Sequence, residues 1–367
     1  MRRLQKKMGS IDFFLFCIIM LLLAIGVVMV YSASSYFAFY KYSDDMHFLK
    51  RQGAWAIIGV ASMIATINID YHKYKRYTGL IMIVTTILLL VVFAFPERNG
   101  ARRWIPLGPA TFQPSEVAKY AVVMYLAKII EAKGDKIESF MKGVIPCLMV
   151  GLFYAGLIYA EKNLSITIVV MGVTFFILFV GGAKFHHLLV VVMPVIVAGM
   201  AAILLVPFRR ARFFSYRNPW VDPLKTGYQL IQSFLALGSG GIWGVGIGQS
   251  RQKCYYIPEP HNDFIFAVLG EELGLIGCTF VVVLFILFVW RGIVTAVRAK
   301  DVYGTLVATG ITSVIAIQAL INIAVVTGSI PVTGVPLPFI SSGGSSLVLN
   351  MTAMGILLNI SRQKSII

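Results

Sequence analysis

Long apolar segments constrain the fold of this chain more than any other feature. Stretches of about 20 residues that match the hydrocarbon thickness of a bilayer recur at residues 11–32, 52–69, 78–95, 115–130, 143–160, 164–182, 188–207, 264–290, 304–326 and 344–361. Only 13% of the residues are charged and 58% are hydrophobic, which excludes a soluble globular fold. The sequence therefore predicts an all-α polytopic membrane protein with about ten transmembrane helices.

One membrane domain, residues 1–367, accounts for the whole chain, because no hydrophilic module separates the apolar segments. The first segment is long enough to span a bilayer and has no small-residue cleavage site, so we expect no cleaved signal peptide. The four cysteines show no paired spacing and the five histidines show no ligand pattern. This argues against a disulfide framework or a zinc site.

Basic residues in the short loops predict the orientation. They gather in alternate loops, beginning with the N-terminal residues Arg2, Arg3, Lys6 and Lys7. Cytoplasmic loops carry such an excess of Lys and Arg. We therefore expect both termini to be cytoplasmic and the large loop at 208–263, between the seventh and eighth spans, to be extracytoplasmic.

The opposite face is also basic. In this arrangement about 15 of the 32 Lys and Arg residues lie on the side that ordinarily avoids them. Attraction to anionic lipid headgroups is one interpretation. A binding surface for a phosphate-bearing substrate is the other, since guanidinium groups donate paired hydrogen bonds to phosphate. The two interpretations are compatible.

Residues 251–274 place carboxylates at the edge of the eighth span. Asp263 follows a cationic stretch, and Glu271 and Glu272 come about two helical turns later. Ionisable groups at such a depth are costly and are often functional. A helix cap or an arginine partner would also explain Asp263. The combination favours chemistry on an anionic, lipid-linked substrate at one membrane face.

Two further segments are too rich in glycine or proline for regular helices. Residues 238–248 contain six glycines, which we expect to allow close backbone packing or a re-entrant turn. Residues 227–241, which lead into them, have the pattern of an interfacial amphipathic helix. Residues 327–346 contain three prolines, which forbid a regular helix. This segment is either an ordinary outer loop or the lining of a polar cavity, with hydroxyls from Ser341, Ser342, Ser345 and Ser346.

Together these segments resemble the SEDS family (shape, elongation, division and sporulation), which includes RodA, FtsW and SpoVE. The similarity runs from MVYSAS (29–34) to the last span. It includes KRQ (50–52), NGARRWI (99–105), QPSE (113–116), NPWVDP (218–223), GYQLIQS (227–233), GQSRQK (248–253), PEPHNDFIFAVLGEELG (258–274) and INIAVVTGSIPVTGVPLPFISSGGSS (321–346). The details are more similar to the FtsW and SpoVE branches than to RodA.

The resemblance implies a peptidoglycan glycosyltransferase of cell division or sporulation in the bacterial cytoplasmic membrane. Such enzymes polymerise lipid II, a disaccharide pentapeptide on undecaprenyl pyrophosphate, into β-1,4 glycan strands on the outer face. The implied partners are a class B penicillin-binding protein, which is a transpeptidase, and proteins of the division or sporulation complex. No nucleic acid is expected as a partner. The family's essential aspartate falls on Asp263.

Glycan extension needs a base that accepts a proton from a sugar hydroxyl while the lipid pyrophosphate leaves. Asp263 is the predicted base. Candidate ligands of the pyrophosphate are Arg102, Arg103, Lys119, Arg212, Arg251 and Lys253. Trp104 would stack on a sugar face or lie in the headgroup region.

Three carboxylates are auxiliary candidates. Glu116 is otherwise explained as a helix cap, whereas Glu271 or Glu272 would tune Asp263 or hold a cation. The sequence identifies no cofactor, and it leaves open a divalent cation that neutralises the pyrophosphate.

One segment departs from the family pattern. Many relatives carry QPDLGT between the fifth and sixth spans, where this chain has EKNLSIT (161–167), with Lys162 and Asn163 in place of a proline and an acid. A role for that acid therefore does not carry over.

Two other functional classes remain as alternatives. A lipid II flippase needs ionisable residues within its spans and a cationic path to both leaflets. A scaffold of a division or spore-coat complex needs no outer carboxylate.

Overall fold

The computed structural model describes residues 9–97, 100–108 and 110–363. Its α-helices within these ranges are α1 (Phe13–Tyr42), α2 (His47–Ile67), α3 (Tyr71–Val91), α4 (Pro114–Lys133), α5 (Ile145–Ala160), α6 (Leu164–Val180), α7 (Phe185–Leu204), α8 (Pro207–Ser215), α9 (Tyr228–Gly240), α10 (Ile265–Val297), α11 (Val302–Val326) and α12 (Gly344–Arg362). Short helical turns lie at Val92–Ala94, Gly134–Glu138, Phe140–Val144 and Pro219–Val221. Strands β1 (Ile105–Leu107) and β2 (Ala110–Phe112) form an antiparallel hairpin, with Ile105 opposite Phe112. The basic residues Arg2, Arg3, Lys6 and Lys7 lie outside the described residues.

Every predicted span coincides with a helix, one of α1–α7 or α10–α12. Within the described ranges, six helices are long and apolar enough to cross a membrane, and α6 and α7 contain shorter apolar helices. These findings confirm an all-α, multi-pass membrane fold. The count of about ten spans and the cytoplasmic termini stay predictions.

Two helices extend beyond their predicted ends. The apolar pattern weakens after residue 32, but α1 continues to Tyr42 and ends at Ser43, whose φ of 53° is left-handed. Small and aromatic residues lower the hydropathy there without breaking the helix. α10 continues to Val297 and is kinked at Gly274, where φ is 67°. Hydropathy reports where lipid contact ends, whereas a helix ends where its backbone turns.

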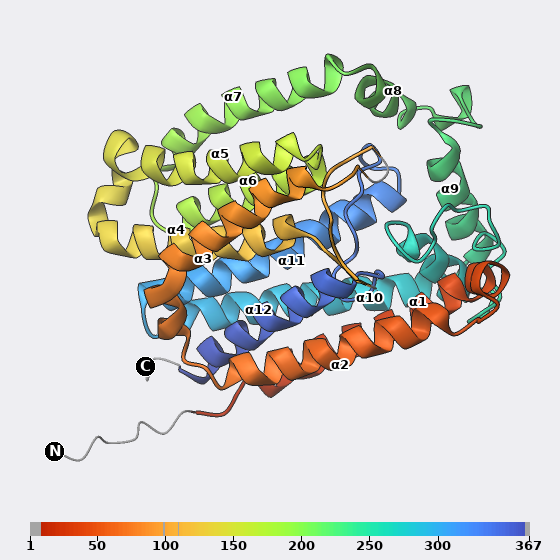
Figure 1. Ribbon diagram of the computed structural model, residues 1–367, viewed down its shortest axis with the longest axis horizontal. Coiled ribbons are helices and arrows are strands. Elements are labelled where there is room, and N and C mark those ends of the chain that lie inside the picture. The colour runs from red at the N-terminus through yellow and green to blue at the C-terminus, as the bar shows by residue number, and fades with distance from the viewer. Residues whose placement is uncertain (1–8, 98–99, 109, 364–367) are drawn as a thin grey trace.

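α11 occupies the centre of the bundle, where α4, α6 and α10 pack around it (Figure 1). α12 and α2 lie side by side, next to α1. α7 lies at the upper margin in Figure 1 and packs against α6 and α8. The polar groups of the central helices are therefore enclosed by protein.

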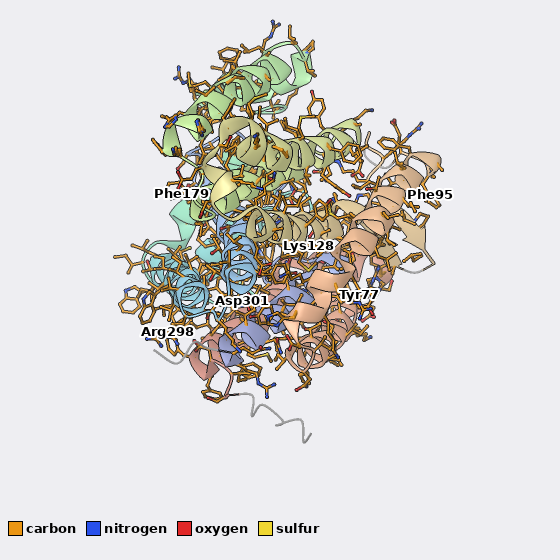
Figure 2. All side chains as sticks on the ribbon, turned by 90° about the vertical axis from the view of Figure 1, so that its left-hand side faces the viewer. Tyr77, Phe95, Lys128, Phe179, Arg298 and Asp301 are labelled. Carbon is orange, nitrogen blue, oxygen red and sulfur yellow. The ribbon has the colours of Figure 1, made fainter. Side chains whose placement is uncertain are left out.

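One end of the bundle, seen in Figure 2, carries charged side chains that include Lys128, Arg298 and Asp301. Asp301 accepts a hydrogen bond from the Tyr71 hydroxyl (2.5 Å) and lies 2.8 Å from Nε2 of His72. These contacts join the first turn of α3 to the start of α11. This is the end predicted to face the cytoplasm, and the candidate residues of the 251–274 segment begin at the opposite end.

The proline-rich segment at 327–343 is not helical, as predicted. It folds against the turn before α10, where Ser341 Oγ donates to the carbonyl of Asn262 (2.8 Å) and Ser342 N donates to the carbonyl of His261 (2.9 Å). It also touches α1, because a Cβ at Gly26 would lie 2.2 Å from the carbonyl oxygen of Phe339. Val335 and residues 337–341 of this irregular backbone are buried in protein, which is the condition for irregular backbone at membrane depth.

The glycine-rich segment packs backbone against backbone, as predicted. Val245 N donates to the carbonyl of Glu271, and Gly246 N donates to that of Glu272, each at 3.0 Å. A Cβ at Gly244 would lie 2.2 Å from the Glu272 carbonyl oxygen. The segment therefore lies directly on α10 beside its kink.

α9 (Tyr228–Gly240) does form within residues 227–241, and part of its apolar face packs against other helices. Leu230 and Ile231 are buried, and α9 packs against α10 and α11. Ser233 Oγ donates to the carbonyl of Val326 (2.8 Å). α9 is thus packed on the bundle, Leu235 of its apolar face is exposed, and its position at the membrane interface stays a prediction.

Candidate functional site

Asp263 lies in the turn before α10, and the turn is held from several sides. Its carbonyl accepts a hydrogen bond from Nδ2 of Asn322 (2.7 Å), which also donates to the carbonyl of Val335 (2.8 Å). The side chain is half-buried. A Cβ on Gly334 would lie 3.2 Å from Asp263 Oδ2, so the carboxylate lies against the backbone of the proline-rich segment. Glycine at 334 keeps that approach open.

The segment that departs from the family pattern reaches the same place. Gly334 N donates to Ser165 Oγ (3.3 Å). Asn163 caps α6 by accepting from Ile166 N (3.4 Å), and its Nδ2 donates to Ser115 Oγ (3.3 Å). Asn163 is buried, and its amide acts as both donor and acceptor, which an ionised acid does not.

Glu116 and Lys119 form a buried ion pair on the first turns of α4. Lys119 Nζ lies 2.9 Å from Glu116 Oε2 and donates to Oε1 of Gln318 on α11 (3.0 Å). Ser346 of α12 donates to Glu116 Oε2 (2.7 Å). Lys119 and Glu116 are each 1% exposed. Three helices thus meet at one charge pair. Gln113, not Glu116, is at the N-cap position of α4, and no side-chain hydrogen bond caps this helix.

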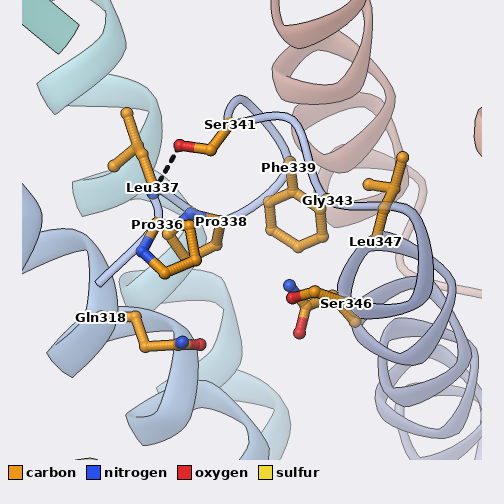
Figure 3. Close-up of a pocket in the computed structure, with 10 residues that line it drawn as sticks. Gln318, Pro336, Leu337, Pro338, Phe339, Ser341, Gly343, Ser346 and Leu347 are labelled. Carbon is orange, nitrogen blue, oxygen red and sulfur yellow. Dashed lines mark hydrogen bonds between the residues drawn. The ribbon is translucent and has the colours of Figure 1, made fainter. Parts of the chain in front are cut away.

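A small cavity separates this network from the proline-rich segment (Figure 3). Its volume is about 20 Å³, and its lining includes Gln318, Pro336, Pro338, Phe339, Ser341, Ser346 and Asn350. That space suits a single water molecule. Ser341 contacts the turn that carries Asp263, while Gln318 and Ser346 contact the ion pair. Two of the four predicted serines therefore line a cavity.

Glu271 and Glu272 hold the loop at 248–254. Glu271 accepts from the Ser250 hydroxyl, from Arg251 N (2.9 Å) and from Gln252 N (3.3 Å). Glu272 accepts from Ser32 Oγ of α1 (2.6 Å) and pairs with Lys253 Nζ (2.8 Å). Lys253 is buried and its charge is paired, whereas the Arg251 side chain is exposed.

The other candidate cations lie in different surroundings. Arg102 is exposed, with Nε 3.6 Å from Glu97 and Nη1 donating to the carbonyl of Phe93 (3.2 Å). Arg103 donates to the carbonyl of Lys162, at the loop between α5 and α6. Trp104 is half-buried beside β1. Arg212 lies on α8, and its side chain is outside the described part of the structure.

Glu161 is a buried carboxyl group that the sequence-based prediction did not single out. It is 0% exposed, and neither of its oxygens has a hydrogen-bond partner among the described residues. Burial raises the pKa of the Glu161 carboxyl to about 8, against the opposing effect of Arg103. The sequence feature that could have identified Glu161 is its position in the segment that departs from the family pattern.

His261 lies two residues before Asp263, in the loop between α9 and α10. Its ring packs 4.5 Å from Phe48, and burial lowers the pKa of His261 to about 4. Among the described residues, no group of three or more His, Cys, Asp or Glu side chains is arranged to hold a metal ion.

Gln318 and Asn322 were also not predicted as site residues from the sequence. They lie four residues apart within the apolar α11, so they share a helix face. Polar residues inside a span are a recognised signal of function. Here that signal marks the face of α11 that meets Lys119 and the Asp263 turn.

Known proteins resemble this chain over nearly its whole length. The model of the FtsW/RodA/SpoVE family, described as cell cycle protein, matches residues 13–366. Stage V sporulation protein E of Bacillus subtilis (strain 168) is 46% identical over 362 residues, which cover 98% of this chain and 99% of that protein. The probable peptidoglycan glycosyltransferase FtsW of Geobacter metallireducens is 41% identical over 360 residues, 97% of this chain and 96% of that protein.

Solved structures share the fold. A chain of a peptidoglycan synthase complex that coordinates polymerization and crosslinking superposes with a TM-score of 0.79 at 26% identity, covering 96% of this chain and 98% of that one. The rod shape determining protein RodA of Thermus thermophilus gives a TM-score of 0.72 at 25% identity, covering 97% and 98%. Family model, relatives and fold agree over the same residues, and the chain belongs to the FtsW/RodA/SpoVE family of cell cycle proteins.

Proposed function

We propose that this chain is a peptidoglycan glycosyltransferase that polymerises lipid II into β-1,4 glycan strands on the outer face of the bacterial cytoplasmic membrane. The observation that carries the proposal is the half-buried Asp263 carboxylate at the start of α10, against the Gly334 backbone. Family membership and the glycosyltransferase names of the FtsW relatives support it. The relative from sporulation and those named FtsW favour a role in sporulation or division.

Asp263 acts as the general base. It accepts the proton of the acceptor sugar hydroxyl as that oxygen bonds to the anomeric carbon, and the bond from this carbon to the pyrophosphate oxygen breaks. No protein nucleophile takes part, so the configuration at the anomeric carbon inverts. The turn around Asp263 is bonded to α11 and to the proline-rich segment, which holds the base in one orientation.

The leaving pyrophosphate needs cationic groups beside the base. Arg102, Arg103 and Arg251 are the proposed ligands, since Arg102 and Arg251 are exposed and Arg103 is half-buried. Guanidinium groups suit phosphate oxygens through paired hydrogen bonds. Lys119 supports the site through Glu116 and Gln318, whereas the buried pairing of Lys253 with Glu272 favours a role in holding the loop.

The proposed partner is a class B penicillin-binding protein, which would cross-link the new strand. The similar fold of a chain from a peptidoglycan synthase complex that coordinates polymerization and crosslinking supports this. In this proposal, other proteins of the division or sporulation machinery bind the same assembly.

Polymerisation of purified lipid II by the solubilised protein with its transpeptidase partner tests the proposal. We expect strands from the wild type, and a loss of about a thousandfold or more in Asp263→Asn and Asp263→Ala, because the base is removed. Glu259→Gln is a matched control, since it neutralises another carboxylate of the same loop that contacts Asn262.

Equal rates in all variants would reject Asp263 as the base and turn attention to Glu271 and Glu272. If no variant makes strands and the wild type instead moves lipid II across proteoliposome membranes, the protein is a transporter. If a cell that carries Asp263→Ala sporulates or divides normally, the protein is a scaffold and not a polymerase.

A further inference from the structure

A second, separate pocket lies where the C-terminal part of α1 meets the loop at 248–254. Its volume is about 560 Å³. Its lining comes from α1, with Ser35, Tyr36 and Tyr40, and from the polar residues Asp45, Gln249 and Lys253. None of these residues takes part in the proposed chemistry at Asp263. The volume falls in the range of small-ligand sites.

The α1 wall presents aromatic rings to the pocket. The rings of Tyr36 and Tyr40 lie 4.8 Å apart, and Tyr255 packs on both, at 5.6 Å and 6.3 Å. Tyr40 is 62% exposed and Tyr255 is 55% exposed. Large, rigid rings that remain accessible while packed on one another offer flat apolar faces with hydroxyls at their edges.

The polar residues of the lining supply hydrogen-bonding groups with little net charge. Lys253 is neutralised by Glu272 beneath the pocket, and Ser32 completes that contact by accepting from Lys253 Nζ (3.2 Å) and donating to Glu272. Gln249 and Asp45 are exposed, and the Tyr31 hydroxyl lies 3.5 Å from Asp45. Mixed donors and acceptors without a cationic excess suit a polyhydroxylated ligand better than a phosphate.

Aromatic residues at the end of a membrane helix also serve as headgroup anchors. A headgroup anchor needs rings that face lipid, and it does not need polar side chains around a shared pocket. Here the rings of Tyr36 and Tyr40 share one pocket with Gln249, Ser250 and Lys253. The pocket therefore combines aromatic ring faces with polar side chains, as a ligand-binding site does.

We propose that this pocket binds sugar units of a glycan chain, with rings stacked on Tyr36 and Tyr40 and hydroxyl or amide groups bonded to Asp45 and Gln249. The choice of a carbohydrate ligand rests on the proposed function. The pocket holds glycan beyond the reacting ends and keeps a growing strand on the enzyme. Its loop runs on to Asp263, and Phe37 of α1 contacts both Tyr255 (6.0 Å) and His261 (6.2 Å).

Binding of a lipid-free β-1,4-linked N-acetylglucosamine tetrasaccharide to the full chain in detergent tests this site without any need for turnover. We expect Tyr36→Ala/Tyr40→Ala to bind about tenfold more weakly, because two stacking faces are lost. Gln249→Leu should weaken binding by a smaller factor, which a lipid anchor would not do. Tyr77→Ala, an exposed tyrosine of α3, is the matched control and should bind as the wild type does.

Asp263→Asn separates this site from the proposed function. It should bind the tetrasaccharide as tightly as the wild type while making no strands. With lipid II, the double tyrosine variant should make shorter strands at a near-normal initial rate. No binding by the wild type, or equal binding by the wild type and the double tyrosine variant, would overturn the proposal whatever the polymerisation assay shows.

Discussion

Two buried lysine–glutamate pairs lie in different regions of this bundle. The Lys119–Glu116 contact is 2.9 Å long and the Lys253–Glu272 contact is 2.8 Å long. The first lies within α4 and extends to Gln318 beside a cavity. The second joins the loop at 248–254 to α10 and α1.

The difference shows that a buried ion pair does not reveal its role by itself. Burying two charges costs several kcal/mol per ion, which their attraction offsets only with good geometry and further hydrogen bonds. At Glu272 the further bond comes from Ser32, which ties down a loop. At Glu116 it comes from Ser346, which lines the cavity near the Asp263 turn. From these neighbours we propose that the first pair supports the site and the second holds the framework.

Removing one charge from either pair should produce the largest effect on stability. Lys119→Met and Lys253→Met each leave a buried carboxylate unpaired, which costs about 3–5 kcal/mol. Thermal unfolding in detergent measures the loss. Lys50→Met is the control, because Lys50 pairs with Asp44 at the surface and should change stability by about 1 kcal/mol or less. A loss at Lys50 as large as at the other two would contradict this assignment.

Neutralising both members of a pair sharpens the comparison. Glu272→Gln/Lys253→Met and Glu116→Gln/Lys119→Met should each recover most of the lost stability, since no unpaired charge remains. Polymerisation of lipid II should return to within about threefold of wild type only for the first double variant. The second should stay at least about a hundredfold slower, because this pair orients Gln318 and Ser346 beside the cavity near the Asp263 turn. Equal activity of the two would abolish the distinction between site and framework.

Glu161 predicts a smaller, pH-dependent effect. Its pKa of about 8 lies above the ordinary value of 4.5, so the folded state keeps a proton that the unfolded chain releases. The free energy of unfolding therefore falls as the pH rises from about 4.5 to about 8. Glu161→Gln should flatten this dependence and raise the melting temperature at pH 8.5 by on the order of a few degrees. Glu97→Gln, at an exposed position, is the control, and parallel curves for wild type and Glu161→Gln would refute the prediction.

The smallest effect is expected at an exposed arginine. Arg102→Ala should raise KM for lipid II by about three- to tenfold with little loss of stability, because one of several cations is removed from the pyrophosphate. Steady-state kinetics at constant ionic strength measure it. Arg298→Ala, at the opposite end of the bundle, is the control. A lower kcat at unchanged KM would contradict a role in binding the substrate.

Much of the fold was predictable because bilayer thickness limits the length of an apolar helix. The ten predicted segments all became helices, and the irregular backbone at 327–343 follows from its prolines. The ends of α1 and α10 were misplaced, and the packing of α9 against α10 and α11 was not predicted. Hydropathy measures transfer to an apolar phase and does not distinguish lipid from protein.

The sequence by itself determined the membrane class, the family and the segment that carries Asp263, because these depend on composition and on motifs of adjacent residues. The catalytic role of Asp263 stays a prediction. Only the tertiary structure decided which polar groups surround the buried carboxylates. Glu116 meets Ser346, and Glu272 meets Ser32, at separations of 230 and 240 residues. Such contacts depend on how α1, α4, α10 and α12 pack together, which no local pattern encodes.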